Sequence, residues 1–281
     1  MKLLWAQFTG ELTKLFARRR TYIGFAAFLA TELLILGLLH LPAAQKALER
    51  TVENSGYLFH DYYSGLTLAY LMMTNTLFFL GSLYLALVAG DVVAKEVEDG
   101  TLRMILSRPV SRVRLILVKY AACAVYTTVM MFYITVTCLA AAIINQGMGS
   151  LFVYSPMHGI FSFMGASEAL WRFGLAAILL SGLTMTITTM AFCFSCFNMK
   201  PAAACVIALT LLFLDLVLQL MPYFSSIHGW LLTYHMGVWN HVFDPHLDPW
   251  MFLESLAYLW GVNASFLFVG TLHFYTRDFK A

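Results

Sequence analysis

The residues best suited to recognition lie in a charged segment between two long apolar runs. The segment reads Glu96-Val-Glu98-Asp99-Gly100-Thr101-Leu102-Arg103-Met104-Ile105-Leu106-Ser107-Arg108-Pro109-Val110-Ser111-Arg112. Thr101 can cap a short helix, and Pro109 ends it, because proline disfavours helical geometry in the residue before it. Leu102, Ile105 and Leu106 then share one face. We predict a stiff, two-faced helix that suits docking of a soluble partner, while an ordinary positively charged loop stays open as the alternative.

Acidic residues within apolar runs form a second set of candidates. They are Glu32, Asp215 and Glu254. Such residues are costly in lipid and usually face the protein interior or a water path. Two interpretations stay open. One is a substrate path or gate. The simpler one is a protonated or internally paired group, with Arg172 as the partner of Asp215 or Glu254.

Histidines gather towards the C-terminal end with two aspartates. These residues are His228, His235, His241, His246, Asp244 and Asp248. Their spacing does not repeat as metal ligands usually do, so we predict no metal site. Cys193 and Cys196 are three residues apart and share a helix face. All five cysteines lie in apolar runs, so we expect core residues and no disulfide framework.

Nucleotide and catalytic motifs are missing from the sequence. No Gly-x-x-x-x-Gly-Lys-Ser/Thr phosphate loop occurs, so the chain cannot cradle ATP by that route. No His-Glu-x-x-His motif or comparable catalytic cluster occurs either. We therefore expect that the chain is not an enzyme and binds no cofactor itself.

Composition indicates that lipid surrounds most of the chain. Hydrophobic residues make up 60% of the 281 residues and charged residues only 11%, against about 25% charged in soluble domains. A bilayer core needs roughly 20 apolar residues per helix. Six segments meet this length: 22–41, 66–93, 115–144, 173–197, 201–221 and 251–275. The uncharged segment 148–167 is rich in glycine and contains Pro156, so we do not count it.

The charges support six spans with both termini in the cytoplasm. Of the 17 lysines and arginines, this topology leaves only Lys46, Arg50 and Arg172 outside, as the positive-inside rule requires. A seventh span would move the basic residues near the C-terminus to the outer side. We predict a multi-pass protein of the cytoplasmic (inner) membrane.

The remaining segments complete a single transmembrane domain over residues 1–281. Residues 1–20 have one apolar and one charged face, which is typical of an amphipathic helix on the membrane surface. Residues 91–114 form the long cytoplasmic loop. Residues 42–65 and 222–250 are external, the latter with short helices re-entering the outer leaflet. The fold class is all-α.

The run from Glu96 to Lys119 resembles the cytoplasmic loop of permeases of ATP-binding-cassette exporters of the second class (ABC type 2). In that family a glutamate precedes Gly-Thr-Leu, as Glu98 precedes Gly100-Thr101-Leu102, and a Leu-Ser-x-Pro-Val-Ser-Arg run follows, as in 106–112. The resemblance covers the whole chain: an amphipathic first helix, six spans and a long external segment between the last two.

The resemblance implies a partner that hydrolyses ATP. The short helix near Thr101 would be a coupling helix in a cleft of that ATPase, with Glu96, Glu98 and Arg103 supplying polar contacts, and residues 1–20 would be the connecting helix. The implied docking residues are Glu96, Glu98, Gly100, Thr101, Leu102, Arg103, Ile105, Leu106, Pro109 and Arg112.

The same resemblance implies the assembly. Two permeases, identical or closely related, would pair with a cytoplasmic ATPase dimer in the lipid bilayer, with ATP and Mg²⁺ bound by the ATPase and no nucleic acid involved. The expected function is that of the membrane-spanning permease subunit of an ATP-driven exporter. The alternative is a secondary transporter driven by an ion gradient through Glu32 and Asp215, which would be expected to contain internal repeats. The sequence shows no such repeat.

Overall fold

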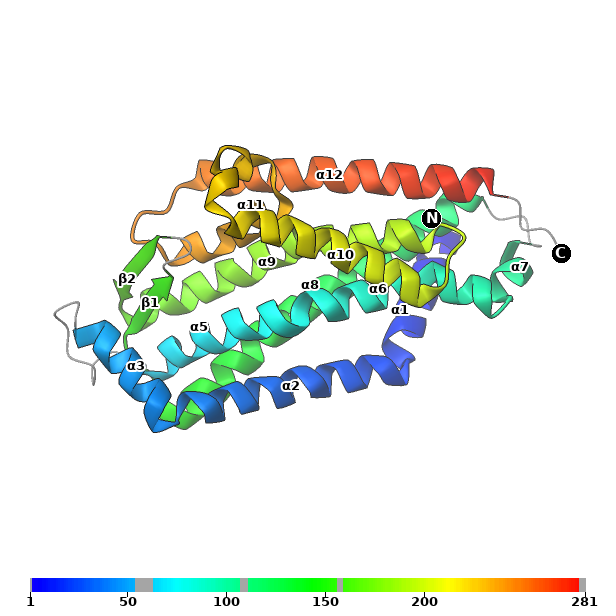
Figure 1. Ribbon diagram of the computed structural model, residues 1–281. Coiled ribbons are helices and arrows are strands. Elements are labelled where there is room, and N and C mark those ends of the chain that lie inside the picture. Colours follow the sequence, from blue (N-terminus) through cyan, green and yellow to red (C-terminus); the bar gives the residue numbers. More distant parts are fainter. Residues whose placement is uncertain (1, 54–62, 107–110, 156–158, 278–281) are drawn as a thin grey trace.

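Long helices run side by side in an elongated bundle (Figure 1). The structure is a computed structural model that describes residues 2–53, 63–106, 111–155 and 159–277. Within these ranges, five helices are long and apolar enough to cross a membrane: α2 (Arg19–Leu39), α8 (Arg112–Gln146), α9 (Ala166–Ser195), α10 (Pro201–Leu220) and α12 (Pro249–Thr276). The chain is therefore an all-α polytopic membrane protein.

A further helical rod contains the predicted span 66–93. It consists of α5 (Gly65–Thr76), the π-helix η1 (Leu77–Gly81) and α6 (Ser82–Glu98), which follow one another without a break. Single π-turns inside α-helices are rare overall, and those that occur are often found at functional sites. The predicted number of six spans depends on counting this rod as one crossing.

The two ends of the bundle carry different elements. The helices α1 (Lys2–Ala17) and α7 (Thr101–Leu106) lie at one end with the C-terminal end of α12 (Figure 1). The helix α3 (Pro42–Glu53) lies at the other end. The first helix and the C-terminal end of the last helix thus lie at the same end of the bundle, as an even number of membrane crossings requires.

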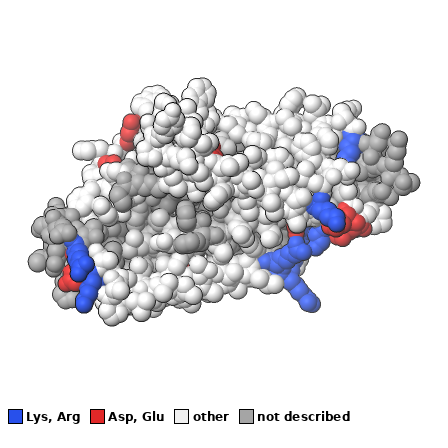
Figure 2. Space-filling model, viewed as in Figure 1, with Lys and Arg blue, Asp and Glu red and all other residues white. Residues whose placement is uncertain are grey.

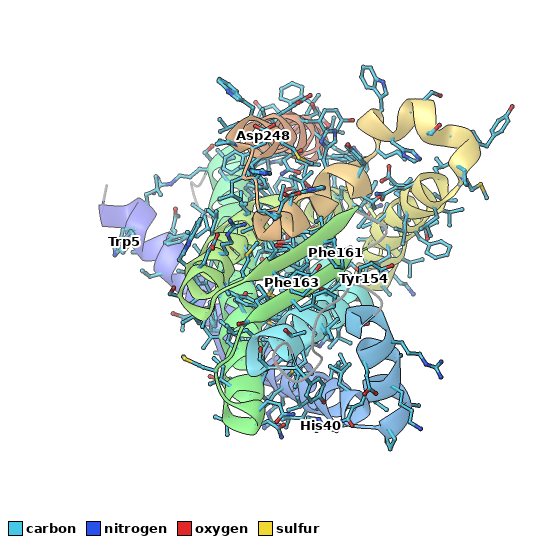
Figure 3. All side chains as sticks on the ribbon, turned by 90° about the vertical axis from the view of Figure 1, so that its left-hand side faces the viewer. Trp5, His40, Tyr154, Phe161, Phe163 and Asp248 are labelled. Carbon is cyan, nitrogen blue, oxygen red and sulfur yellow. The ribbon has the colours of Figure 1, made fainter. Side chains whose placement is uncertain are left out.

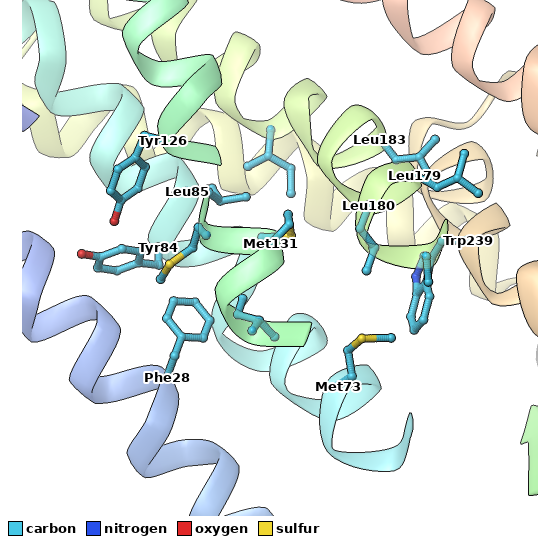
Figure 4. Close-up of a cluster of buried hydrophobic side chains, with 14 of the residues drawn as sticks. Phe28, Met73, Tyr84, Leu85, Tyr126, Met131, Leu179, Leu180, Leu183 and Trp239 are labelled. Atoms are coloured by element: carbon cyan, nitrogen blue, oxygen red, sulfur yellow. The ribbon is translucent and has the colours of Figure 1, made fainter. Parts of the chain in front are cut away.

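The core is built around α9, the most buried of the five long helices. It packs against α6, α8, α10 and α12. Figure 4 shows part of this core, where Met131, Leu180 and Trp239 are buried among other large apolar side chains. Hydroxyl pairs add polar contacts between α8 and α9, including Thr127 Oγ1 to Thr188 Oγ1 at 2.7 Å. Such hydrogen bonds are typical of packed membrane helices.

The segment 148–167 contains a β-hairpin that the sequence analysis did not predict. Strand β1 (Leu151–Ser155) pairs antiparallel with β2 (Ile160–Met164). Alternating side chains explain the strands, because apolar residues such as Leu151 and Val153 are buried on one face. The other face carries the four aromatic residues Phe152, Tyr154, Phe161 and Phe163 (Figure 3).

Short helices fill the predicted external segment 222–250. They are η2 (Pro222–Trp230), α11 (Leu232–Met236) and η3 (Gly237–Phe243). The last of these is tied to the bundle, since Tyr70 Oη donates to Asn240 Oδ1 at 3.0 Å. Their depth in the outer leaflet stays a prediction.

Charged side chains in the view of Figure 2 gather towards the two ends of the molecule. The middle of this face is almost uncharged. This distribution fits a bilayer around the middle of the bundle.

The backbone around Gly65 lies close to the backbone at the end of α8, and this close contact gives a test of the packing. A Cβ at Gly65 would lie 2.5 Å from Gly147 O, so we expect Gly65→Ala to destabilise the protein by about 1–3 kcal/mol. Gly174 has no atom within 4 Å of an added Cβ, and Gly174→Ala should leave stability unchanged or raise it by up to about 1 kcal/mol. Thermal unfolding in detergent measures both. Equal melting temperatures for the two variants would contradict the packing.

Candidate functional site

The short helix α7 follows α6 through a tight turn. Gly100 has a φ of 71°, in the left-handed region that favours glycine. The Thr101 hydroxyl donates to the carbonyl oxygen of Glu96 at 3.2 Å. Thr101 is the first residue of α7, not the cap preceding it that the sequence analysis expected. The turn therefore fixes where the helix leaves the bundle.

The face of α7 predicted to dock a partner packs against the protein itself. Leu102 is only 1% exposed, and Ile105 is half-buried against the core. Met104 is 66% exposed and lies on the outer side. The side chains of Arg103 and Leu106, and all of Pro109, lie outside the described residues. Leu102 and Ile105 thus hold α7 in place, and an outside partner would meet the side that carries Met104.

Four charged side chains form a cluster that joins α1, α6 and α8. Lys119 Nζ, on α8, lies 2.8 Å from Glu11 Oε2 of α1 and 2.8 Å from Glu96 Oε2 of α6. Lys14 completes the cluster at 2.7 Å from Glu11 Oε1 and 3.5 Å from Glu96 Oε1. Lys119 is 1% exposed. We call these four residues the charge cluster, and they bind α1 to the base of α7.

The cluster shifts the pKa values of Glu11 and Lys14 in the directions that favour their charged forms. Burial raises the pKa of Glu11, but Lys119 and Lys14 outweigh it, and the net pKa lies below the ordinary value. Burial lowers the pKa of Lys14, but Glu11 and Glu96 outweigh it, and the net pKa is raised. Two acids and two bases thus meet, with Lys119 enclosed by protein and Lys14 open to solvent.

Arginines tie other elements at the same end. Arg20 forms a salt bridge with Asp91 and joins α2 to α6. Arg112 donates to the carbonyl oxygens of Tyr275, at 3.0 Å, and Arg277, at 2.8 Å, at the end of α12. Ser111 is the N-cap residue of α8, but its side chain makes no capping hydrogen bond. The helix ends are therefore held mainly by basic side chains.

A cavity of about 210 Å³ opens beside the charge cluster. Its lining includes Gln7 and Lys14 of α1, Ile105 of α7 and Val118 of α8. The junction of these three helices is thus not fully packed.

Comparison with known proteins bears on this geometry. Residues 8–215 match the family described as ABC-2 family transporter protein. The chain belongs to the ABC-2 transporter family. No curated protein matches it significantly. The family identifies the chain as a membrane component for transport, and the matched residues include α1, α7 and the charge cluster.

Asp215 is bonded within the permease, as the simpler of the two interpretations held, but its partners are not the arginine that the sequence suggested. Its carboxylate accepts from the backbone N–H of Leu232 at 3.2 Å and of Thr233 at 2.6 Å. The Thr233 hydroxyl donates to it as well, at 2.6 Å. Asp215 therefore holds the start of α11 against α10.

Arg172 pairs with neither Asp215 nor Glu254, so that expectation was wrong. Its guanidinium donates to Glu168 Oε1 at 2.6 Å, one helical turn away, and to the carbonyl oxygens of Val242, at 2.8 Å, and Asp244. The main chain at the end of η3 offered carbonyl groups that sequence spacing does not reveal. Glu254 is exposed on α12.

Glu96 faces inward in the permease, and the cluster that binds it was not predicted. The sequence analysis assigned Lys119 to the positive cytoplasmic side and Glu11 to the polar face of an interfacial helix. One signal was present, since Lys119 lies inside the apolar run 115–144 and a buried base needs acidic partners. Choosing Glu11 and Glu96 among the acids required the fold.

Replacement of the buried base tests the charge cluster. We expect Lys119→Met to destabilise the permease by about 3–5 kcal/mol, because Glu11 and Glu96 would lose their buried partner and keep only the exposed Lys14. The exposed Lys14 serves as the matched control, and Lys14→Met should cost about 0–1 kcal/mol. Combining Lys119→Met with Glu11→Gln and Glu96→Gln should restore much of the stability. Similar losses from both lysines in thermal unfolding would argue against the cluster.

The pH dependence of stability gives a second test. The pKa of Glu11 is lowered on folding, so its contribution is complete above the ordinary value of 4.5 and is lost as pH falls through the lower folded value. The melting temperature of Glu11→Gln should lie below that of the wild type at pH 7, and the gap should close under strongly acidic conditions. Glu98→Gln, at an exposed acid, should show no gap at either pH. A Glu11→Gln gap that widens on acidification would contradict this assignment.

Proposed function

We propose that this chain is the membrane-spanning permease subunit of an ATP-driven exporter, and that a separate ATPase subunit hydrolyses the ATP. Membership of the ABC-2 family supports a transport role. The sequence contains no phosphate loop, which favours a division of labour between two chains.

The proposal rests on the way α7 is attached to the rest of the protein. Leu102 fixes this helix from the inside, and the charge cluster ties its base to α1 and α8. Met104 points outward from the fixed helix. A partner pressing on α7 would therefore move several membrane helices and not merely bend a loop. This is what a coupling helix must do to bias two arrangements of the membrane helices.

The residues divide into contact and positioning roles under this proposal. Met104, with the exposed Glu98 and with Arg103, would meet the ATPase. Glu96 and Leu102 would position α7, since both are buried. α1 would act as the connecting helix, and the cavity beside Lys14 would admit a side chain of the ATPase.

The orientation and the assembly follow from the same proposal. The α7 end would face the cytoplasm, with both termini, in the inner membrane. The balance of basic residues supports this side, since only Lys46, Arg50 and Arg172 would lie outside. Two permeases would pair with a dimer of the ATPase, which binds ATP and Mg²⁺.

A charge on the exposed side of α7 tests the docking. We expect Met104→Glu to reduce the ATPase recovered with the tagged permease from its native membrane about tenfold or more, because an unpaired charge would be buried at the contact. Met148 is the matched control, because it is 64% exposed against 66% for Met104 and lies beyond the far end of α8. Met148→Glu should leave the recovery unchanged.

Folding is checked separately by the melting temperature of each variant. Recovery of the ATPase with Met104→Glu at the wild-type level, in a folded protein, would refute docking on this side of α7.

A further inference from the structure

Glu32 is fully buried inside the membrane part of the bundle. It lies on α2 with an exposure of 0%. One carboxyl oxygen, Oε1, lies 3.0 Å from Thr137 Oγ1 of α8. The other, Oε2, has no hydrogen-bond partner among the described residues. No lysine or arginine in the described part of the chain forms an ion pair with this carboxyl.

The hydrogen bonds around Thr137 limit how Glu32 can be satisfied. Thr137 Oγ1 also lies 2.8 Å from Tyr133 O and 3.2 Å from Ile134 O. A hydroxyl group has one hydrogen to donate and two lone pairs that accept. If that hydrogen goes to the main-chain carbonyls of α8, Glu32 must itself be the donor. Only the protonated form of Glu32 can donate.

Other buried or half-buried acids of the chain show what an ionised carboxylate requires here. Asp215 collects three donors, and Glu96 and Asp91 are each paired with basic side chains. Glu32 has the Thr137 hydroxyl, which also serves the main chain, and the thiol of Cys138, which is a weak donor. An isolated ionised carboxylate in an apolar interior is strongly unfavourable. Glu32 therefore lacks the set of donors or basic partners that the other three acids have.

We propose that Glu32 is a proton-binding site, which holds its proton at neutral pH while α2 is packed against α8. The carboxylic acid donates to Thr137 Oγ1, and Thr137 donates to the carbonyl oxygen of Tyr133. Because Glu32 is fully enclosed, a proton is the one cation that binds there without separation of the helices. Separation of α2 from α8 would admit water and release the proton.

The neighbouring helices offer no compensating charge near Glu32 among the described residues. On α8, the titratable groups within its electrostatic reach are Tyr133 and Cys138. On α5, which also packs against α2, the titratable residue is Tyr70, and its hydroxyl is bonded to Asn240. The helices α1 and α3 meet α2 near its two ends (Figure 1). Their charged residues are Lys2, Glu11, Lys14, Lys46, Glu49, Arg50 and Glu53.

Infrared difference spectroscopy of the purified full chain at neutral pH tests the proposal. The wild-type minus Glu32→Gln spectrum should contain the C=O stretching band of a protonated carboxylic acid, with a small downshift in heavy water. Asp215→Asn is the matched control, because Asp215 is a second acid in the apolar part of the chain. Its difference spectrum should contain carboxylate bands only.

A second variant keeps the test valid if Glu32→Gln does not fold. Thr137→Val preserves the carboxyl group and removes its hydrogen-bond partner, so the acid band should move to higher frequency. Carboxylate bands in the Glu32→Gln difference, or an acid band that Thr137→Val leaves in place, would overturn the assignment of a proton to Glu32.

Discussion

A lysine side chain with 1% exposure sets the conditions for the whole α7 end of this permease. The Lys119 ammonium group is enclosed by protein, and a charge so enclosed is tolerated only with opposite charges in contact. Glu11 comes from α1, and Glu96 comes from the end of α6. The three helices must therefore keep their relative positions for as long as the charges stay buried. Because of this constraint, α7 is attached to the bundle and does not hang on a flexible turn. Under the proposed function, a force on α7 would therefore reach the membrane helices.

The two ends of the molecule are stabilised by different chemistry. At the α7 end, ion pairs and arginines bonded to main-chain carbonyls hold the helix ends. At the other end, a β-hairpin, short helices and aromatic side chains cover the bundle, and Arg172 and Asp215 bind main-chain groups. Between them, the contact of Glu32 Oε1 with Thr137 Oγ1 joins α2 to α8.

Sequence reasoning predicted those features that depend on local composition. Length and hydropathy were sufficient for the long helices, and Thr101 indicated that a short helix begins near this residue. It missed the hairpin because the glycines and Pro156 of segment 148–167 argued only against a membrane helix, while the alternation of Leu151 to Ser155 was too short to stand out. It gave Arg172 the wrong partners, because carbonyl groups at the end of η3 leave no trace in side-chain patterns. The apolar face of α7 was predicted, but whether it faces a partner or the permease depends on tertiary packing.

The salt bridges of Lys119 hold α1 and α6 in a fixed relative position. The most direct measurement is the distance distribution between spin labels at Gly10→Cys on α1 and Glu98→Cys on α6, recorded in the purified permease with and without Lys119→Met. We expect one narrow distribution of label distances when Lys119 is present. When Lys119 is replaced by Met, in a protein that still folds, the distribution should be broad or displaced. An equally narrow distribution at the same distance in both would contradict this expectation.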